Sequence, residues 1–485
     1  MRPTFRTRSF AAAGLLGLIA AGPLACTDDR AHQSLSSDIT DIAHTSVKDQ
    51  SIGNCWIYAT MSWVESLHLT ETGDELNLSE SYIGYFHWFE QIAGGGDGQP
   101  QLGTLDEEDG VKELGTGGWW ASAVELMRRY GNMDEGAFIP EEANEARSAR
   151  QKTARDAINL SLKEGVLSDP ANRAKPEVVR DELNKAWGLN QDVIDAIDAA
   201  FGPGVDRTLY DGPPPEGSPI RTNESILVGH TESGDPLNLA DAVGEPRFSF
   251  WGGPPSRSGP FAWRVSNYPT SSSGRRNLQI EVQKAMHRSL PVVMTWFVDF
   301  AALENDNTFR APPQDPGRQG GHLVTLEDYE VENVPGFGTL EAGVLVEDPE
   351  KLTAALSPDA SIKFFRIKNS WGTSVSPEPG QGDELKGYYD LWMDYLNADL
   401  QKKDSEGRQR ALWRFVLPPS TFFSGGREEA PSCGHDLCST GAALTPECDP
   451  CAAEIIDADP YCGSTSWDDL CVGQVASVCG QTCEE

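Results

Sequence analysis

The sequence lacks long apolar runs and an excess of basic residues. No interior apolar run reaches the roughly 18 residues that a membrane-spanning helix needs. Lysine and arginine together number 39 against 74 aspartates and glutamates, which gives a formal net charge of −35. This acidity argues against nucleic acid as a partner and against attraction to anionic lipid through a basic surface.

The amino terminus differs from the rest of the chain. Three arginines precede an apolar run at residues 10–21, a pattern typical of an export signal. Small residues then lead to Cys26 and a few acidic residues, which resembles a bacterial lipoprotein processing site, although Pro23 departs from that pattern. We therefore predict an export signal at 1–25, a tether at 26–44 and Cys26 as a lipidation candidate. The exported protein is extracellular or anchored at the cell surface or in the periplasm.

Cysteine is absent from most of the chain and concentrated at its end. Between Cys26 and the tail the only cysteine is Cys55, which is therefore either an intermolecular partner or a reactive thiol. In an exported protein, eight cysteines in the last 53 residues predict a disulfide framework. A zinc site using Cys448, Cys451 and His435 is the alternative, and we expect disulfides and no metal. The disulfide candidates are Cys433, Cys438, Cys448, Cys451, Cys462, Cys471, Cys479 and Cys483.

Cys55 opens a predicted helix. From this residue onward apolar side chains recur with helical spacing, and Gly53 and Asn54 supply the turn and the helix entry before it. The first turn of a helix stabilises a thiolate, so we expect the pKa of this thiol to be lowered. A nucleophile is one interpretation and a small buried hydrophobe is the other. The absence of a disulfide partner favours the nucleophile.

The pattern of elements changes along the chain. We expect helices in the first half and β-strands in the second, which predicts an α+β body with a cleft between two lobes. A segment rich in proline, glycine and serine at 202–274 predicts an irregular insertion. The helices are expected at 55–67, 80–89, 120–131, in succession through 140–201, and at 278–288, and the strands at 291–297, 322–329, 342–346, 362–368 and 387–393.

Four dispersed residues have the chemistry that a thiol nucleophile needs. His322 is the only histidine that opens a predicted strand after a diglycine, which makes it the candidate base. Asn369 ends another predicted strand, where its amide can hold one imidazole nitrogen, and Trp371 can keep water from that bond. Gln50 can join the backbone N–H of Cys55 in stabilising an oxyanion, worth roughly 3 to 4 kcal/mol per donor. Each residue alone is equally typical of an ordinary strand end, turn or polar surface.

Together, in the order Gln, Cys-Trp, Gly-His and Asn-Ser-Trp-Gly, these residues resemble the papain-like cysteine peptidases over residues 45–420. The resemblance implies a helical left lobe, a β-barrel-like right lobe and a cleft for an extended peptide. It also implies roles for four residues: Cys55 as nucleophile, His322 as general base and acid, Asn369 as its orienter, and Gln50 as oxyanion donor.

The resemblance extends to substrate binding. Gly117 and Gly118 match the diglycine whose backbone pairs with the substrate, and Trp371 matches the shielding tryptophan. The segments LSESYIGYFHWFEQI and GGWWASAVELMRRYGNMDEGAF are similar to the bleomycin hydrolase and aminopeptidase C branch, which also has a helical insertion. One departure is that Gln50 precedes Cys55 by five positions, where the family generally has six. The chain also continues into a cysteine-rich tail, so neither aminopeptidase preference nor a hexameric cage is carried over.

The sequence therefore predicts an exported cysteine peptidase that hydrolyses peptide bonds through a thioester and needs no cofactor. Its partners are peptide or protein substrates and not nucleic acid, and the sequence does not predict its oligomeric state. A catalytically silent papain-like scaffold that binds at the cell surface through its tail is the rival, and acyl transfer to an amine is a third alternative. The predicted peptidase domain spans 45–420 with an insertion at 135–275, followed by a linker at 421–431 and a disulfide module at 432–485.

Overall fold

The structure is a computed structural model. It describes residues 42–94, 106–107, 110–143, 145–247, 256–373, 385–403, 405–425, 435, 437–445, 450–479 and 483. The predicted export signal, Cys26, Cys433 and Cys448 lie outside the described residues. Within this described part, no helix combines the length and the apolar character needed to cross a membrane.

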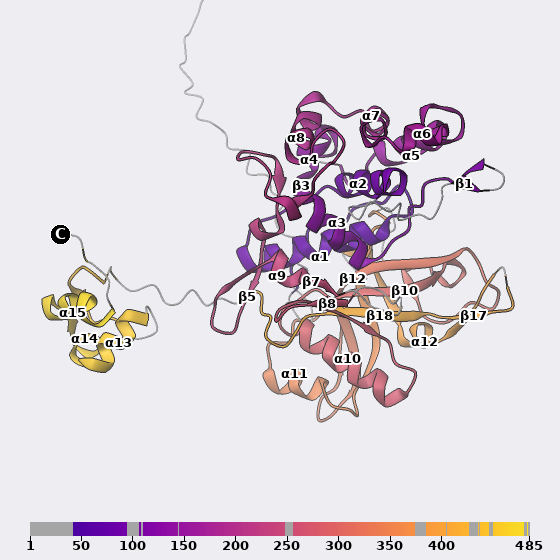
Figure 1. The fold of residues 1–485 in the computed structure, drawn as a ribbon. Helices are drawn as coiled ribbons and strands as arrows, with labels where there is room; N and C mark the ends of the chain where they lie inside the picture. The colour runs from indigo at the N-terminus through magenta and orange to yellow at the C-terminus, as the bar shows by residue number, and fades with distance from the viewer. Residues whose placement is uncertain are drawn as a thin grey trace, which may run out of the picture. The chain divides into compact units, whose positions relative to one another are not determined.

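The helix that begins at Cys55 is buried on nearly all its faces. This helix, α1 (Cys55–Thr72), ends where Gly73 adopts a left-handed conformation (φ 77°) and donates its N–H to the carbonyl of Leu69. It lies between the other helices of the first half and the strands of the second half (Figure 1). The hydroxyl of Thr325 donates to the carbonyl of Ala59 across this contact. The expected helix is therefore confirmed, and a helix in this position has no solvent face to keep polar.

Two further helices of the first half also match the prediction. Helix α2 (Glu80–Ala93) is capped by Ser79, whose hydroxyl accepts from the backbone of Tyr82. Helix α3 (Trp120–Tyr130) ends at Gly131 as expected. The hydroxyl of Tyr82 joins these helices by donating to the carbonyl of Tyr130.

The insertion consists of helices followed by short hairpins. Helices α6 and α7 both begin with a proline, which suits the first helical position because its nitrogen needs no hydrogen-bond acceptor there. The helices are α4 (Glu135–Phe138), α5 (Arg150–Glu164), α6 (Pro170–Arg173), α7 (Pro176–Trp187), α8 (Gln191–Phe201) and α9 (Leu239–Val243). The small strand pairs across the chain are β1 (Asp106–Glu107) with β2 (Gly110–Val111), β3 (Asn132–Met133) with β4 (Ile220–Arg221), β5 (Leu227–His230) with β6 (Pro236–Asn238), β7 (Glu245–Arg247) with β8 (Ser256–Ser258), and β16 (Asp399–Gln401) with β17 (Arg408–Arg410).

The second half forms an eight-stranded sheet with the order β11-β15-β14-β12-β10-β18-β9, and β13 pairs with β12. All pairs are antiparallel except β11 with β15. Within the described residues this order ends at β11 and β9 and does not close on itself. The strands are β9 (Arg264–Asn267), β10 (Val293–Asp299), β11 (Thr308–Phe309), β12 (Gln319–Val334), β13 (Gly338–Leu340), β14 (Ser361–Lys368), β15 (Tyr388–Trp392) and β18 (Leu412–Leu417), and the helices beside them are α10 (Ser272–Met286), α11 (Pro349–Ala355) and α12 (Met393–Leu396).

One expected strand, at 342–346, is wrong. Gly343 has a positive φ of 78° and donates its N–H to the Asp328 carboxylate, which makes this segment a turn. Val344 and Leu345 are 51% and 43% exposed, so their apolar side chains do not contribute to the core. The hairpin partner of β12 is the preceding segment, β13.

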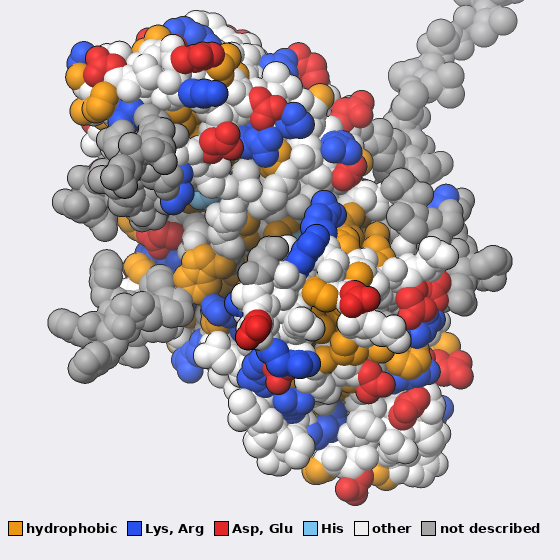
Figure 2. Space-filling model, turned by 90° about the vertical axis from the view of Figure 1, so that its right-hand side faces the viewer, with side chains coloured by type: hydrophobic (Ala, Val, Ile, Leu, Met, Phe, Trp, Pro, Cys, Tyr) orange, Lys and Arg blue, Asp and Glu red, His pale blue; other side chains and the backbone are white. Residues whose placement is uncertain are grey.

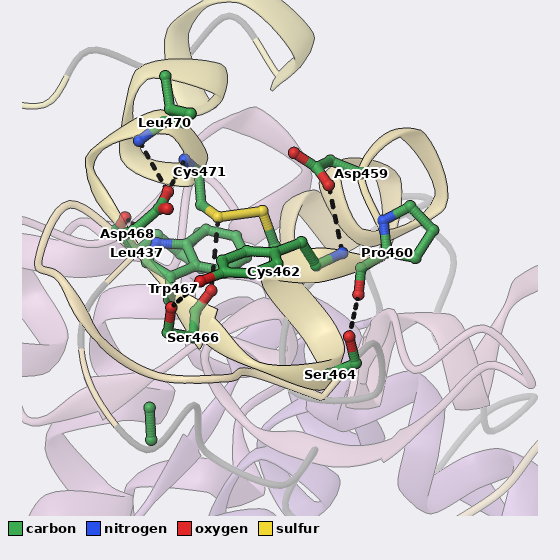
Figure 3. The surroundings of a disulfide bond; sticks show 12 residues. Leu437, Asp459, Pro460, Cys462, Ser464, Ser466, Trp467, Asp468, Leu470 and Cys471 are labelled. Atoms are coloured by element: carbon green, nitrogen blue, oxygen red, sulfur yellow. Dashed lines mark hydrogen bonds between the residues drawn. A yellow bond between two sulfur atoms is a disulfide. The ribbon is translucent and has the colours of Figure 1, made fainter.

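The tail has its own small core, which three disulfides among its described residues surround. Six of the eight predicted cysteines are paired as Cys438–Cys483, Cys451–Cys479 and Cys462–Cys471. Because Cys451 is in a disulfide, it is not available to zinc. Trp467 lies beside the Cys462–Cys471 bridge and donates its indole N–H to the carbonyl of Leu437 (Figure 3). The elements are α13 (Pro450–Ala458), α14 (Tyr461–Ser464), α15 (Asp469–Cys479), and β19 (Gly441–Ala442) paired with β20 (Ser466–Trp467).

Candidate active site

Cys55 is the first residue of α1 and is a free, buried cysteine. The backbone of Leu323, on β12, forms a hydrogen bond with its thiol. Because Leu323 directly follows His322, folding brings the predicted nucleophile and the predicted base into one neighbourhood although 267 positions separate them in the sequence. Their approach is set by the packing of α1 against the sheet.

The expected lowering of the thiol pKa is wrong. Burial raises the pKa of Cys55 to about 11, and backbone hydrogen bonds from Leu323, Trp56 and Cys55 itself oppose the rise without cancelling it. Removal from water destabilises the thiolate by more free energy than the start of the helix and these three hydrogen-bond donors contribute to its stabilisation. The sulfur is therefore protonated at rest, and an attack on a substrate requires a base that takes its proton.

His322 has one nitrogen engaged and one remaining for that task. Its Nε2 lies 2.8 Å from Oδ1 of Asn369. Burial lowers the pKa of His322 to about 4, and the bond to Asn369 opposes this shift. The ring is therefore neutral near neutral pH, and because Nε2 donates to Asn369, Nδ1 is the basic nitrogen.

The orientation of the Asn369 amide is fixed by a second donor. The backbone N–H of Ser370 donates to Oδ1 of Asn369 at 2.8 Å, and the Asn369 side chain is buried. An N–H donor at this atom requires an oxygen there, which settles which end of the amide faces the imidazole. Trp371 stacks on the His322 ring, with a centroid distance of 4.7 Å and an interplanar angle of 23°. This indole covers the ring of the histidine.

Gln50 is held on the segment that leads to Cys55. Its Nε2 donates to the carbonyl of Ile52 at 3.0 Å, and its Oε1 accepts from the Ser370 hydroxyl at 2.6 Å. The backbone N–H of Gln50 also donates to the carbonyl of Ser370. One amide hydrogen is thus used within the loop, and the second is the one that remains for a substrate oxygen.

Gly117 and Gly118 form an exposed backbone segment, and hydrogen bonds from buried side chains hold the two residues before it. The Trp56 indole N–H donates to the carbonyl of Thr116 at 2.8 Å. The Gln91 amide donates to the carbonyl of Gly115 and accepts from its N–H. The sequence predicted the diglycine through its motif, but Gln91 has no motif of its own, and its role follows only from where α2 lies.

A buried charge cluster, also missed from the sequence, lies behind the site. Lys48 Nζ is 2.9 Å from Glu80, 3.6 Å from Glu65 and 3.6 Å from Glu135, and these carboxylates raise the lysine pKa. Lys368 Nζ donates to the hydroxyl of Thr45, which donates in turn to Glu65.

A cavity of about 20 Å³, comparable to one water molecule, separates this cluster from Leu323 and Asn369. The cluster connects the segment before α1 to the end of β14, where Asn369 follows. Its five members are dispersed over residues 48 to 368, so each is an ordinary charged residue in the sequence.

Comparisons with known proteins give matches to the tail and to the described body. A family model described as a domain of unknown function (DUF8252) matches residues 431–483. No curated protein matches the sequence of the chain. Solved structures that are similar to this chain include proteins described as cysteine proteases.

Three of these structures illustrate the similarity. Xylellain from Xylella fastidiosa is 14% identical, with 79% of this chain and 84% of that chain covered and a TM-score of 0.28. PepW from Lactobacillus rhamnosis is 12% identical, with 79% and 81% covered and a TM-score of 0.36. Bromelain from Ananas comosus is 13% identical, with 77% and 93% covered and a TM-score of 0.26. These identities and TM-scores are low, so the proposal below rests on the geometry of the site.

Proposed function

We propose that this protein is a cysteine peptidase of two-lobed papain-like fold that hydrolyses peptide bonds through a thioester. The observation that carries the proposal is the pair of contacts around β12. The backbone of Leu323 contacts the Cys55 thiol, and His322, one residue earlier, gives its Nε2 to Asn369 at 2.8 Å. A nucleophile, a base and an orienting group are the three parts that acyl transfer by a thiol requires.

The proposed reaction begins with a neutral pair. As the Cys55 sulfur attacks the carbonyl carbon of the substrate, Nδ1 of His322 takes the thiol proton, and the carbonyl oxygen becomes an oxyanion. The Cys55 backbone N–H at the start of α1 and the second amide hydrogen of Gln50 stabilise that oxygen. The imidazolium then returns its proton to the departing amine as the thioester forms. A water molecule, deprotonated by His322, hydrolyses the thioester and releases the thiol.

The surface near the site supports a peptide substrate. The exposed backbone at Gly117 and Gly118 offers N–H and C=O groups to an extended chain, which is how peptides add to an open strand. Lysine and arginine side chains are interspersed with acidic ones on the face drawn in Figure 2. This mixed charge, with the net charge of −35, does not favour nucleic acid as a substrate.

We also propose that the protein is exported. Three disulfides support an oxidising compartment, because such bonds are rare where thiols are kept reduced. Lipid attachment at Cys26, a peptidase domain at 45–420 with its insertion at 135–275, a linker at 421–431 and a separate disulfide module at 432–485 are parts of the same proposal.

The rival, a silent scaffold of similar fold, is favoured by two observations. Cys55 is only 9% exposed, and Gln50 already donates to Ile52. A thiol-directed reagent separates the two functions, since a thiol of pKa about 11 with no base alkylates more slowly than free cysteine. For the enzyme, iodoacetamide at pH 7 labels Cys55 faster than it labels free cysteine, and His322→Ala removes that advantage. Slow labelling that His322→Ala leaves unchanged would establish the scaffold. Adding an amine acceptor to the turnover assay reports acyl transfer as a new amide product.

A further inference from the structure

Arg414, in the interior of β18, is a partly buried arginine without an acidic partner. Its Nε–H is buried and donates to no acceptor among the described residues, and Arg414 forms no ion pair with any of them. Its guanidinium carbon lies 5.8 Å from the ring centroid of Trp119, the residue that follows the diglycine at 117–118. Arg414 thus faces the segment to which the proposed function assigns substrate binding.

Several other arginines of the described residues that are buried have a carboxylate partner. Arg366 forms a bidentate pair with Asp390, and Arg180 pairs with Asp198. Arg257 pairs with Glu125. A buried guanidinium N–H without an acceptor is costly, and a contact with the face of an aromatic ring does not supply one. Arg129 and Arg257 also have a buried Nε without an acceptor, but each has a carboxylate at another guanidinium nitrogen, whereas Arg414 has none among the described residues. This difference indicates that the carboxylate partner of Arg414 arrives with a ligand.

The sheet register places Arg414 in line with the nucleophile. Leu323 on β12 pairs with Thr295 on β10, and Thr295 pairs with Arg414 on β18. Residues directly opposite one another in a sheet project their side chains to the same face, and neighbouring strands lie about 4.8 Å apart. Arg414 is therefore two strands, or about 10 Å, from Leu323, whose backbone contacts the Cys55 thiol.

We propose that Arg414 determines substrate specificity by binding a carboxylate side chain on the amino side of the scissile bond. An extended peptide advances about 3.3 Å per residue, and alternate side chains share one face. The scissile carbonyl lies at Cys55 in this arrangement. Counting back along the peptide from the residue that carries this carbonyl, the next side chain that lies closer to Arg414 and on the same face of the sheet belongs to the second residue before the cleaved bond. The substrate class is thus a peptide with aspartate or glutamate at that position. This inference rests on the proposed function for its direction along the peptide.

A kinetic experiment uses the full-length protein and matched fluorogenic peptides that carry glutamate, glutamine or leucine two residues before the cleaved bond. We expect kcat/KM to be about tenfold higher for the glutamate peptide than for the glutamine peptide, because a carboxylate forms a stronger, charge-assisted hydrogen bond with Arg414 than a neutral amide does. Arg414→Met removes the preference and keeps turnover of the leucine peptide, and Arg414→Glu shifts the preference to a fourth peptide that carries lysine at the same position. Arg264→Met, at an exposed arginine of β9, is the matched control and retains the preference. Equal rates for glutamate and glutamine with the unaltered protein would overturn the inference while leaving the peptidase proposal intact.

A binding experiment makes the two proposals separable. In a Cys55→Ala background, which cannot turn over, the glutamate peptide binds about tenfold tighter than the glutamine peptide by fluorescence anisotropy, and Arg414→Met equalises them. If that preference holds while the unaltered protein cleaves no peptide, the specificity site stands and the peptidase proposal fails. If both peptides bind equally in this background, the carboxylate site is excluded. Retention of the preference after Arg414→Met would assign it to another residue and also overturn the inference.

Discussion

Trp56 and Gly118 lie so close together that a Cβ atom on Gly118 would be 2.4 Å from the nearest indole carbon. Trp56 directly follows the candidate nucleophile, and Gly118 belongs to the candidate substrate segment. The indole is 1% exposed and its N–H is bonded to Thr116, so it has no free space into which to move. A single side chain thus sets the spacing between the start of α1 and the diglycine backbone.

Gly118→Ala is therefore expected to destabilise the protein. The added methyl group overpacks against Trp56, which costs about 1 to 3 kcal/mol in the free energy of unfolding. Gly117→Ala is the matched control, because a Cβ there meets no atom within 4 Å, and it changes the free energy of unfolding by less than about 0.5 kcal/mol. Denaturant unfolding of both variants measures the difference. Equal stabilities of the two variants would show that the Trp56 indole moves to make room for the methyl group.

Asn369→Ala is expected to lower kcat by about 10² with little change in KM, because the loss of the acceptor frees the His322 ring from its productive orientation. Asn369→Asp keeps an oxygen at the same place and adds a negative charge, which raises the pKa of His322. The acid limb of its activity profile therefore moves to higher pH. Steady-state kinetics across pH test both variants. A loss confined to KM would mean that Asn369 binds substrate and does not orient the base.

The protonation state of the pair leads to a third prediction. Since the pKa of Cys55 is raised to about 11 and that of His322 is lowered to about 4, the resting enzyme holds a neutral thiol beside a neutral imidazole. The ultraviolet absorbance of a thiolate is then absent at pH 7 and appears only in strongly alkaline solution. Activity rises as the pH rises through about 4, where His322 becomes able to accept a proton. It falls near pH 11, because a thiol that has lost its proton leaves His322 without the proton that it passes to the departing amine.

Difference spectra against Cys55→Ala give the thiolate signal without interference from the tyrosines. A thiolate band at pH 6 that disappears in His322→Ala would contradict this prediction and establish an ion pair. The two apparent pKa values would then belong to the coupled pair and to neither residue alone.

The parts of the site that were predictable are those with a local signature. A helix starting at Cys55, a histidine opening a strand after two glycines and an asparagine at a strand end are each visible within a few residues. The glycine at 131 likewise predicted where α3 ends, because a glycine readily adopts a positive φ, here 70°, which ends the helix. The His322–Asn369 hydrogen bond agrees with the interpretation that these patterns supported.

The remainder depends on residues that are distant in sequence. The pKa of Cys55 is raised because β12 covers the thiol, which outweighs the helix-start effect that the local pattern suggested. The apolar run at 342–346 failed as a strand because β13 already occupied the edge of β12. Strand β18 was not predicted, so the position of Arg414 on the sheet was not predicted either. The periodicity of a sequence can indicate a strand, but it does not indicate which other strand will pair with it.

The buried charge cluster permits a last prediction about stability. Burial lowers the pKa of Lys368 to about 8 in the folded protein, against 10.5 as the ordinary value for lysine. Between pH 8 and 10.5 the unfolded chain binds more protons than the folded one, so this residue makes the free energy of unfolding rise with pH in that window. Below pH 8 it costs the fold about 3 kcal/mol.

Lys368→Met is therefore expected to be more stable than the unaltered protein at pH 7, with an advantage that shrinks as the pH rises from 8 to 10.5. Lys363→Met on the same strand is the control, because Lys363 is partly exposed and pairs with Glu330 at 2.6 Å. Its removal costs at most about 1 kcal/mol. Urea unfolding of the three proteins at pH 7 and at pH 10 gives the comparison. A Lys368→Met variant that is less stable at pH 7 would show that the contacts with Thr45 and Glu65 outweigh the cost of burying the charge, since those two groups lose their cationic partner in that variant.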